Sequence, residues 1–281
     1  MPWNPVEPPR IRLSALFEDW YEHHGRQLRD GEARKAKLAN VAKALGDPFA
    51  HELTPERWSQ YRTGRASSVS TATLNRELSY VRAAFRLLRR LGVWPGPDPL
   101  EHVQAGRERD PGLRYLSFEE MGRLWEALQA SRNPDVYAVA RLACATGARW
   151  SEAERLESHN LHESHVVYAE TKSGKRRVVP ITKELFDECT RDHAGRLYRF
   201  CYDAFGNALD RAEIVLPKGQ RTHVLRHTFA SHFMLNGGNI LELQQLLGHS
   251  SLAMTMRYAH LAPGHLADAR RLNPIALAKQ R

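Results

Sequence analysis

A run of prolines and glycines about a third of the way along the sequence divides the chain into two parts. Residues 94–99 read Trp-Pro-Gly-Pro-Asp-Pro, and the polar stretch 101–112 keeps no helical periodicity. Prolines at this density end helices, because each fixes φ and lacks an amide donor. The chain of 281 residues also exceeds the usual size of one domain. The sequence therefore predicts a domain over residues 10–95, a linker over 96–112 and a second domain from residue 113.

The part before the linker has the periodicity of α-helices. Thr54-Pro55 has the form of an N-cap followed by proline at the first helical position. The clearest helix is predicted over residues 74–91, where one apolar face is formed by Leu74, Leu78, Val81, Phe85 and Leu88. We expect this domain to be a small helical bundle.

A second face of the same predicted helix is basic. It carries Arg82, Arg86 and Arg89, with Arg90 beside them. Arginines one turn apart can lie along a DNA backbone and contact its phosphates. The alternative is that they form an ordinary solvated face.

The second domain is predicted to be mainly α-helical with a small antiparallel sheet. Ser117-Phe-Glu-Glu120 has the form of a capping box and predicts a helix to about Gln129. Helical pattern continues over 136–144 and stops at Thr146-Gly147. In residues 165–181, β-branched residues on both sides of Ser173-Gly174 predict a β-hairpin. Short helices broken by glycine follow from residue 223.

The charge balance favours a polyanionic partner. The formal net charge is +9, with 18 basic and 14 acidic residues up to residue 112 and 23 basic and 18 acidic residues after it. Each phosphate that a lysine or arginine neutralises releases bound counterions, so nucleic acid is the leading candidate. Because both parts are basic, both can contact the same partner.

Other classes of function lack their usual signals. No stretch is long and apolar enough for a membrane helix and the amino terminus lacks a signal-peptide core, so we expect a cytoplasmic protein without a membrane partner. The three cysteines form no C-x-x-C pair. His223 and His227 lie four apart but lack the H-E-x-x-H pattern, and no phosphate-binding G-x-x-x-x-G-K-[ST] loop occurs. We therefore expect neither a metal site nor a cofactor.

The residues of the second domain that could bind or activate a phosphate form an ordered series. They are Arg149, Lys172, His223, Arg226, His249 and Tyr258. Their motifs are Thr146-Gly-Ala-Arg149, His223-Val-Leu-Arg226-His227, Leu246-Leu-Gly-His249 and Met256-Arg-Tyr258. Over residues 113–265 this series resembles the active-site set of the tyrosine recombinase (phage integrase) family. Residues 10–95 resemble that family's core-binding domain in length, helical pattern and basic character.

The physical chemistry of the arginines agrees with the roles that the resemblance implies. A phosphodiester under attack gathers negative charge, and a planar guanidinium can meet two of its oxygens at once. The resemblance makes Arg149 and Arg226 the phosphate ligands and gives His249 a hydrogen bond to the same phosphate. Glu152 lies three residues after Arg149, a spacing that allows an ion pair on one helical face.

The resemblance makes Tyr258 the nucleophile. A phenol with a pKa near 10 is about 0.1% ionised at pH 7, so nearby arginines are expected to lower its pKa and a histidine to accept its proton. The family assigns that base to the position of His223 and gives His227 a supporting role. The 5′-hydroxyl leaving group needs a proton, which the resemblance assigns to Lys172 on the hairpin. Lys175 is the alternative, and both lysines could instead be solvated charges at the hairpin tip.

The implied reaction is strand cutting and rejoining through a 3′-phosphotyrosyl intermediate, as in a phage or prophage integrase. The expected partner is double-stranded DNA, bound by a homotetramer on two duplexes, with accessory DNA-bending or directionality proteins. Residues 266–281 form a tail that either docks on a neighbouring protomer or packs on its own domain. Helical pattern begins near Ile11, so an arm-binding domain is either naturally absent or trimmed.

Two other functions fit parts of the sequence. A type IB topoisomerase uses the same residue types to relax DNA, and a noncatalytic DNA-binding protein would need only the basic helix. The DNA target and the direction of the reaction are not encoded in any motif of a single sequence.

Overall fold

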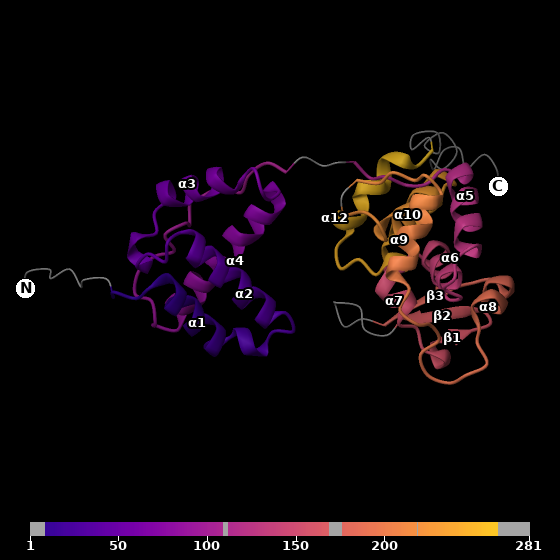
Figure 1. Ribbon diagram of the computed structural model, residues 1–281, viewed down its shortest axis with the longest axis horizontal. Coiled ribbons are helices and arrows are strands. Elements are labelled where there is room, and N and C mark those ends of the chain that lie inside the picture. Colours follow the sequence, from indigo (N-terminus) through magenta and orange to yellow (C-terminus); the bar gives the residue numbers. More distant parts are fainter. Residues whose placement is uncertain (1–8, 109–111, 169–175, 218, 264–281) are drawn as a thin grey trace, which may run out of the picture. The chain divides into compact units, whose positions relative to one another are not determined.

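The computed structural model describes residues 9–108, 112–168, 176–217 and 219–263. The chain divides into two compact units, Met1–Asp110 and Pro111–Arg281. Helices predominate in both units (Figure 1). Among the residues just given, no helix has the length and apolar character needed to cross a membrane.

The first unit is a bundle of helices. Its elements are α1 Leu13–His23, η1 Gly25–Gln27, α2 Gly31–Ala44, η2 Ala50–Glu52, α3 Pro55–Arg65 and α4 Thr71–Arg90. Helices α1, α2 and α4 pack on one another and enclose an apolar core. The predicted start of α3 is confirmed, because the Thr54 side chain accepts a hydrogen bond from the Arg57 amide.

Helix α4 has the apolar face that the sequence predicts. Leu74, Leu78, Val81, Phe85 and Leu88 are all buried. The helix begins at Thr71, a few residues before the predicted start, because the Ser70 side chain accepts a hydrogen bond from the Thr73 amide. Such an N-cap satisfies a helix donor that would otherwise have no partner.

The structure differs from the prediction for the linker. Leu100 is fully buried in the core of the first unit, and the Leu100 amide donates to the Asp98 carboxylate. The Asp98 carboxylate also lies 3.4 Å from Arg82 and 3.4 Å from Arg86, both on α4. Residues 96–103 are therefore part of the first unit. Proline stops regular structure, but it does not stop a segment from packing, and the apolar and charged side chains between these prolines find partners on α4.

The second unit combines helices with a small sheet. Its helices are α5 Phe118–Gln129, α6 Val136–Thr146, α7 Trp150–Glu154, α8 Lys183–Cys189, α9 Tyr202–Arg211, α10 His223–Leu235, α11 Ile240–Leu247 and α12 Leu252–Thr255. The 3₁₀ helices are η3 Ser158–Asn160 and η4 Met256–Leu261. The strands are β1 Leu161–His162, β2 His165–Tyr168 and β3 Arg177–Pro180. The predicted capping box is confirmed at the start of α5.

The sheet is antiparallel in the order β1-β2-β3. Strand β2 pairs with β3 in the register His165↔Pro180 to Tyr168↔Arg177, which confirms the predicted strands of the hairpin. The predicted turn at Ser173-Gly174 lies outside the described residues. Strand β1 was not predicted, because its length of two residues gives no periodic signal.

Two apolar clusters organise the second unit. The larger one surrounds α6, which packs on α7, α8 and α10. The smaller one consists of Ala230, Met234, Leu243, Leu247 and Tyr258 and joins α10, α11 and η4. The predicted fold class, a helical bundle followed by a mainly helical α+β domain, is confirmed.

Candidate active site

A glycine turn after α6 brings the chain into the centre of the second unit. Gly147 ends α6 with φ of +63°, a left-handed conformation that L side chains adopt rarely. A Cβ at this position would lie 2.5 Å from Phe229 and 2.7 Å from Leu247. Both the backbone angle and the close approach therefore require glycine. The turn delivers Arg149 to the N-terminus of α7.

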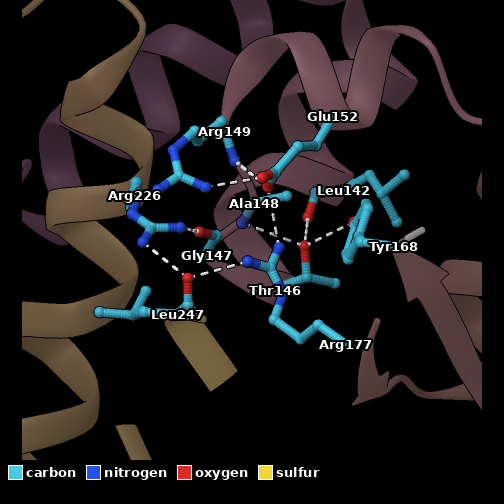
Figure 2. A network of polar contacts seen from close by, with 10 residues as sticks. All are labelled: Leu142, Thr146, Gly147, Ala148, Arg149, Glu152, Tyr168, Arg177, Arg226 and Leu247. Atoms are coloured by element: carbon cyan, nitrogen blue, oxygen red, sulfur yellow. Dashed lines mark hydrogen bonds and ion pairs between the residues drawn. The ribbon is translucent and has the colours of Figure 1, made fainter. Parts of the chain in front are cut away.

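Arg149 and Glu152 form the ion pair that their spacing predicts. Arg149 Nη1 lies 2.7 Å from Glu152 Oε1, and the Arg149 amide donates to Oε2 at 2.9 Å (Figure 2). Burial acts to raise the pKa of Glu152, but the charge of Arg177 on β3, the hydrogen bond from the Arg149 amide and the Arg149 guanidinium together lower it. The Arg149 side chain is 30% exposed, so an anion can reach its guanidinium.

Arg226 is buried on α10 and held by backbone carbonyls. Its Nη1 donates to the Gly147 carbonyl at 2.7 Å, and its Nη2 donates to the Leu247 carbonyl at 2.7 Å (Figure 2). These carbonyls end α6 and α11, so Arg226 joins the ends of two helices to a third. Burial, followed by the charges of Arg149 and Arg177, lowers the pKa of Arg226 to about 10.

Arg177 belongs to the same network and was missed by the sequence analysis. It begins β3, and its Nη1 donates to the Leu247 carbonyl at 2.8 Å and its Nη2 to Glu152 Oε2 at 2.9 Å (Figure 2). The pattern that could have identified Arg177 is the alternation of a strand, in which every second residue faces inward. In β3, Arg177 and Val179 are buried, and Val178 faces solvent. An arginine at an inward-facing strand position needs a buried partner.

Tyr258 is buried and hydrogen-bonded to His227. The Tyr258 side chain is 1% exposed, and its hydroxyl lies 2.7 Å from His227 Nδ1. Burial raises the pKa of Tyr258 and outweighs Arg226 and Arg257, which act in the other direction. The expected lowering by arginine charge is present, but burial has the larger effect on this pKa. The contact of His227 with the nucleophile candidate was also not foreseen.

The other two histidines lie in the same cationic surroundings. Gly248, with φ of +66°, ends α11 as predicted and leads to His249, whose Nδ1 lies 2.8 Å from the Thr255 hydroxyl. His223 is the exposed first residue of α10, and its ring lies 6.3 Å from that of His227. Partial loss of hydration, followed by the charges of Arg226 and Arg149, lowers the pKa of His223.

Burial and neighbouring positive charge keep the imidazoles of His227 and His249 neutral at pH 7. Burial and then Arg257 lower the pKa of His227 to about 4. Burial and then Arg226 lower the pKa of His249 to about 4. The corner where α7, β3, α10, α11 and η4 meet therefore combines fixed guanidinium charge with neutral imidazoles that can accept protons. An anion with several oxygens is the natural ligand of such an arrangement.

The remaining predicted site residues lie elsewhere. Lys172 and Lys175 fall outside the described residues. In the first unit, Arg82 donates to the Glu101 carbonyl at 2.7 Å and also pairs with Asp98, so its guanidinium fastens residues 98–103 to α4. The Arg86 side chain is 55% exposed, and Arg89 and Arg90 are exposed. Contacts of these four arginines with DNA stay a prediction.

Known proteins resemble this chain over nearly its whole length. Residues 114–265 match the Phage integrase family, and residues 10–107 match the family described as Phage integrase, N-terminal domain. The integrase of Escherichia phage 186 is 44% identical over 98% of this chain and 84% of its own length. The integrase of Haemophilus phage HP1 is 48% identical over 94% of this chain and 81% of its own length.

A solved structure shares the fold at low identity. A lambda integrase tetramer bound to a Holliday junction superposes with a TM-score of 0.74 at 15% identity, covering 91% of this chain and 79% of that one. At this identity the likeness concerns the fold, whereas the phage 186 and HP1 relatives carry the family assignment. The chain belongs to the phage integrase family and is a site-specific tyrosine recombinase.

Proposed function

We propose that this site cuts and rejoins double-stranded DNA, with Tyr258 as the nucleophile. The Tyr258 oxygen attacks a backbone phosphorus, the bond to the 5′-oxygen breaks, and a 3′-phosphotyrosyl ester forms. The 5′-hydroxyl of a second strand then attacks this ester and releases the tyrosine. One ester replaces another at each step, so no nucleoside triphosphate is consumed. The proposal is carried by the 2.7 Å contact between Tyr258 and His227 on α10, the helix that also holds Arg226.

Arg149 and Arg226 are the proposed phosphate ligands. A guanidinium has five N–H donors, and the Arg226 contacts described above use both of its terminal nitrogens only once each. Donors therefore remain for a phosphate oxygen. Arg149 is partly exposed and approaches from the N-terminus of α7. His249, neutral and oriented by Thr255, is the third proposed donor to the phosphate through its Nε2 proton.

Two histidines are candidates for the base that takes the phenol proton. The family resemblance favours His223, which stays a prediction. The hydrogen bond to Tyr258 favours His227, because a neutral imidazole with its proton on Nε2 presents an acceptor at Nδ1. The pKa of His227, about 4, keeps that acceptor free at neutral pH. We take His227 as the second candidate on this observation.

Attack requires Tyr258 to become accessible. Its side chain is 1% exposed and belongs to the apolar cluster between α10, α11 and η4. We propose that η4 shifts when DNA binds, so that the phenol oxygen reaches the phosphate. The leaving 5′-oxygen then takes a proton from a lysine of the β2–β3 connection, with Lys172 proposed and Lys175 as the alternative.

The proposed partner is double-stranded DNA, bound as a homotetramer on two duplexes. The lambda integrase described above is a tetramer on a Holliday junction, and exchange of both strands between two duplexes needs one cut in every strand, one for each protomer. Residues 266–281 are proposed to dock on a neighbouring protomer, and accessory DNA-bending or directionality proteins to assist. Residues 10–95, with Arg86, Arg89 and Arg90, are proposed to contact the core DNA site. We place this activity in the bacterial cytoplasm, where phage DNA meets host DNA.

Covalent trapping tests the proposal. The position of cleavage is first mapped by sequencing the DNA to which the protein becomes covalently attached. A duplex nicked just beyond that position loses its short product on cleavage, so wild-type protein should accumulate covalently on the DNA. Tyr258→Phe should form no covalent complex, whereas Tyr198→Phe is the matched control, since Tyr198 is also buried and donates one hydrogen bond, to the Cys189 carbonyl. Trapping by Tyr258→Phe at the wild-type level would refute the nucleophile assignment. Strand exchange between two sites, rather than relaxation alone, separates a recombinase from a topoisomerase.

The choice between the two bases has its own test. If His227 is the base, His227→Asn should lower the single-turnover cleavage rate by about 100-fold or more, and His223→Asn by much less. The reverse ranking would assign the base to His223. Equal DNA affinity of the two variants, measured by titration of the nicked duplex, is the control that separates proton transfer from binding.

A further inference from the structure

Arg177 connects the groups that hold the two proposed phosphate ligands. Leu247 O accepts hydrogen bonds from Arg226 Nη2 at 2.7 Å and from Arg177 Nη1 at 2.8 Å. Glu152 accepts from Arg149 Nη1 at 2.7 Å and from Arg177 Nη2 at 2.9 Å. Figure 2 shows the resulting chain from Arg149 through Glu152, Arg177 and Leu247 to Arg226.

We propose that Arg177 is a positioning residue for strand cleavage, which fixes Arg149 and Arg226 relative to each other on the scissile phosphate. This inference rests on the proposed function of those two arginines. Arg177 is 5% exposed, and its terminal nitrogens contact Leu247 and Glu152, the groups that also hold Arg226 and Arg149, so the proposed role is exerted through these neighbours. Without it, Glu152 and the end of α11 are no longer joined by β3.

Contacts around Arg177 fix the orientation of its guanidinium plane. The group lies 4.7 Å from the centroid of the Tyr168 ring, on the neighbouring strand β2. The Tyr168 hydroxyl lies 2.8 Å from Thr146 Oγ1, which in turn donates to the Leu142 carbonyl at 2.6 Å. These contacts connect the Arg177 guanidinium to β2, to α6 and to the turn at Gly147. Stacking of this kind favours arginine over lysine.

Arg177 also adds to the positive charge at the site. The guanidinium groups of Arg149 and Arg177 both pair with the carboxylate of Glu152, and Arg226 is close enough for its pKa to respond to the charges of all three. The Arg177 charge contributes to the lowered pKa of both Arg226 and His249. Loss of Arg177 therefore changes both the spacing of the phosphate ligands and the potential at the phosphate.

A lysine cannot reproduce this connection. Its ammonium is a single point of charge, whereas the arginine fork donates in two directions, to a carbonyl on α11 and to a carboxylate on α7. Arg177→Lys keeps the charge and breaks one of the two links. It therefore separates positioning from charge, and it is less disruptive than a neutral substitution.

The test measures cleavage and binding separately with the full-length protein. The probe is the nicked duplex described above, and the readouts are the single-turnover cleavage rate at saturating protein and the dissociation constant of the complex. Arg177→Lys should cleave about 10- to 100-fold more slowly, as is typical for groups that orient a catalytic residue. Its DNA affinity should stay within about 3-fold of wild type, because lysine keeps the charge and the proposed role of Arg177 is to position other residues. Arg176→Lys, at the exposed neighbouring position, should match wild type in both.

Folding is controlled with a second variant. Thermal unfolding should show that Arg177→Lys is folded at the assay temperature. Arg177→Met combined with Glu152→Gln removes the buried cation and carboxylate together, which avoids an unpaired buried charge. This double variant should also fold and bind DNA but cleave slowly.

The last measurement tests whether Arg177 acts through Arg149, one of the proposed phosphate ligands. In an Arg149→Ala background, Arg177→Lys should slow cleavage by much less than it does alone, because the group that it positions is gone. An Arg177→Lys protein that cleaves within about 3-fold of wild type would overturn the inference. If Tyr258→Phe and Arg226→Ala still cleave, the proposed function itself fails, so the two failures are distinguishable.

Discussion

Arginines gather around a carboxylate in both units, but the two clusters differ in how far their guanidinium groups are buried. In the first unit, Arg82 and Arg86 share Asp98, and their side chains are 23% and 55% exposed. In the second unit, Arg177 and Arg226 are each 5% exposed and are held mainly by carbonyl oxygens and Glu152. Water screens the first cluster, whereas the second keeps an excess of positive charge in a low-dielectric site. The arginines of the first cluster hold residues 98–103 against α4, whereas those of the second are suited to bind an anion.

The largest expected difference in stability is between substitutions of the two carboxylates, Glu152 and Asp98. Glu152→Gln removes the negative charge that balances two guanidinium groups, one of them buried, and should lower the free energy of unfolding by about 3–5 kcal/mol. Asp98 is itself buried, but its two arginines are 23% and 55% exposed, so water can solvate the guanidinium groups that Asp98→Asn leaves without a counter-charge, and this variant should cost about 1 kcal/mol. Denaturant unfolding of both variants measures the difference. Equal losses of unfolding free energy in the two variants would contradict the proposed difference between the two clusters.

The neutral imidazoles of the second unit predict a dependence of stability on pH. The folded pKa values of His227 and His249 are about 4, below the usual 6.5 of the unfolded chain. The unfolded state therefore takes up protons first, so the stability is present above about pH 6.5 and falls as the pH drops toward 4. Unfolding titrations between pH 7.5 and 4 should show this fall.

His227→Asn should flatten that pH dependence, because it removes one of the two groups. His193→Asn is the control at an exposed position of the same unit. A His227→Asn protein whose stability falls with pH as steeply as wild type would exclude His227 as a source of the effect.

Inorganic phosphate should stabilise the protein through the second cluster. An anion that binds only the folded state raises its stability by about 1 kcal/mol at a concentration of a few times Kd. The thermal midpoint should rise with phosphate in wild type and rise less in Arg149→Ala, whose side chain is the partly exposed member of the cluster. Arg86→Ala should keep the full response. If the rise of the thermal midpoint were lost in Arg86→Ala instead, the anion site would lie in the first unit.

The smallest effect on stability is expected at Arg86. Because its side chain is 55% exposed, Arg86→Met should change the free energy of unfolding by less than about 0.5 kcal/mol. If Arg86 contacts a DNA phosphate, the variant should bind DNA more weakly, and the slope of log K against log salt should fall by about one. An unchanged slope would leave Arg86 as part of a solvated face.

Most of the site could be named from the sequence. Arg149, Arg226, His249 and Tyr258 are found by motif order, and the glycines at 147 and 248 by their positions after periodic helices. The apolar face of α4 and the capping box of α5 are likewise local patterns, which helical periodicity and capping chemistry fix over a few residues.

Tertiary packing decided the rest. The sequence assigned residues 96–103 to a linker, but Leu100 and Asp98 find their partners on α4. Arg177 is one arginine of the segment Arg176-Arg177, and only the sheet register shows which of the two is buried. His227 and Tyr258 lie 31 residues apart, and their contact depends on how η4 packs on α10. The sequence determined the chemical groups and their order, because motifs are local. The partners of each group, and so its charge state, were decided by contacts between distant segments.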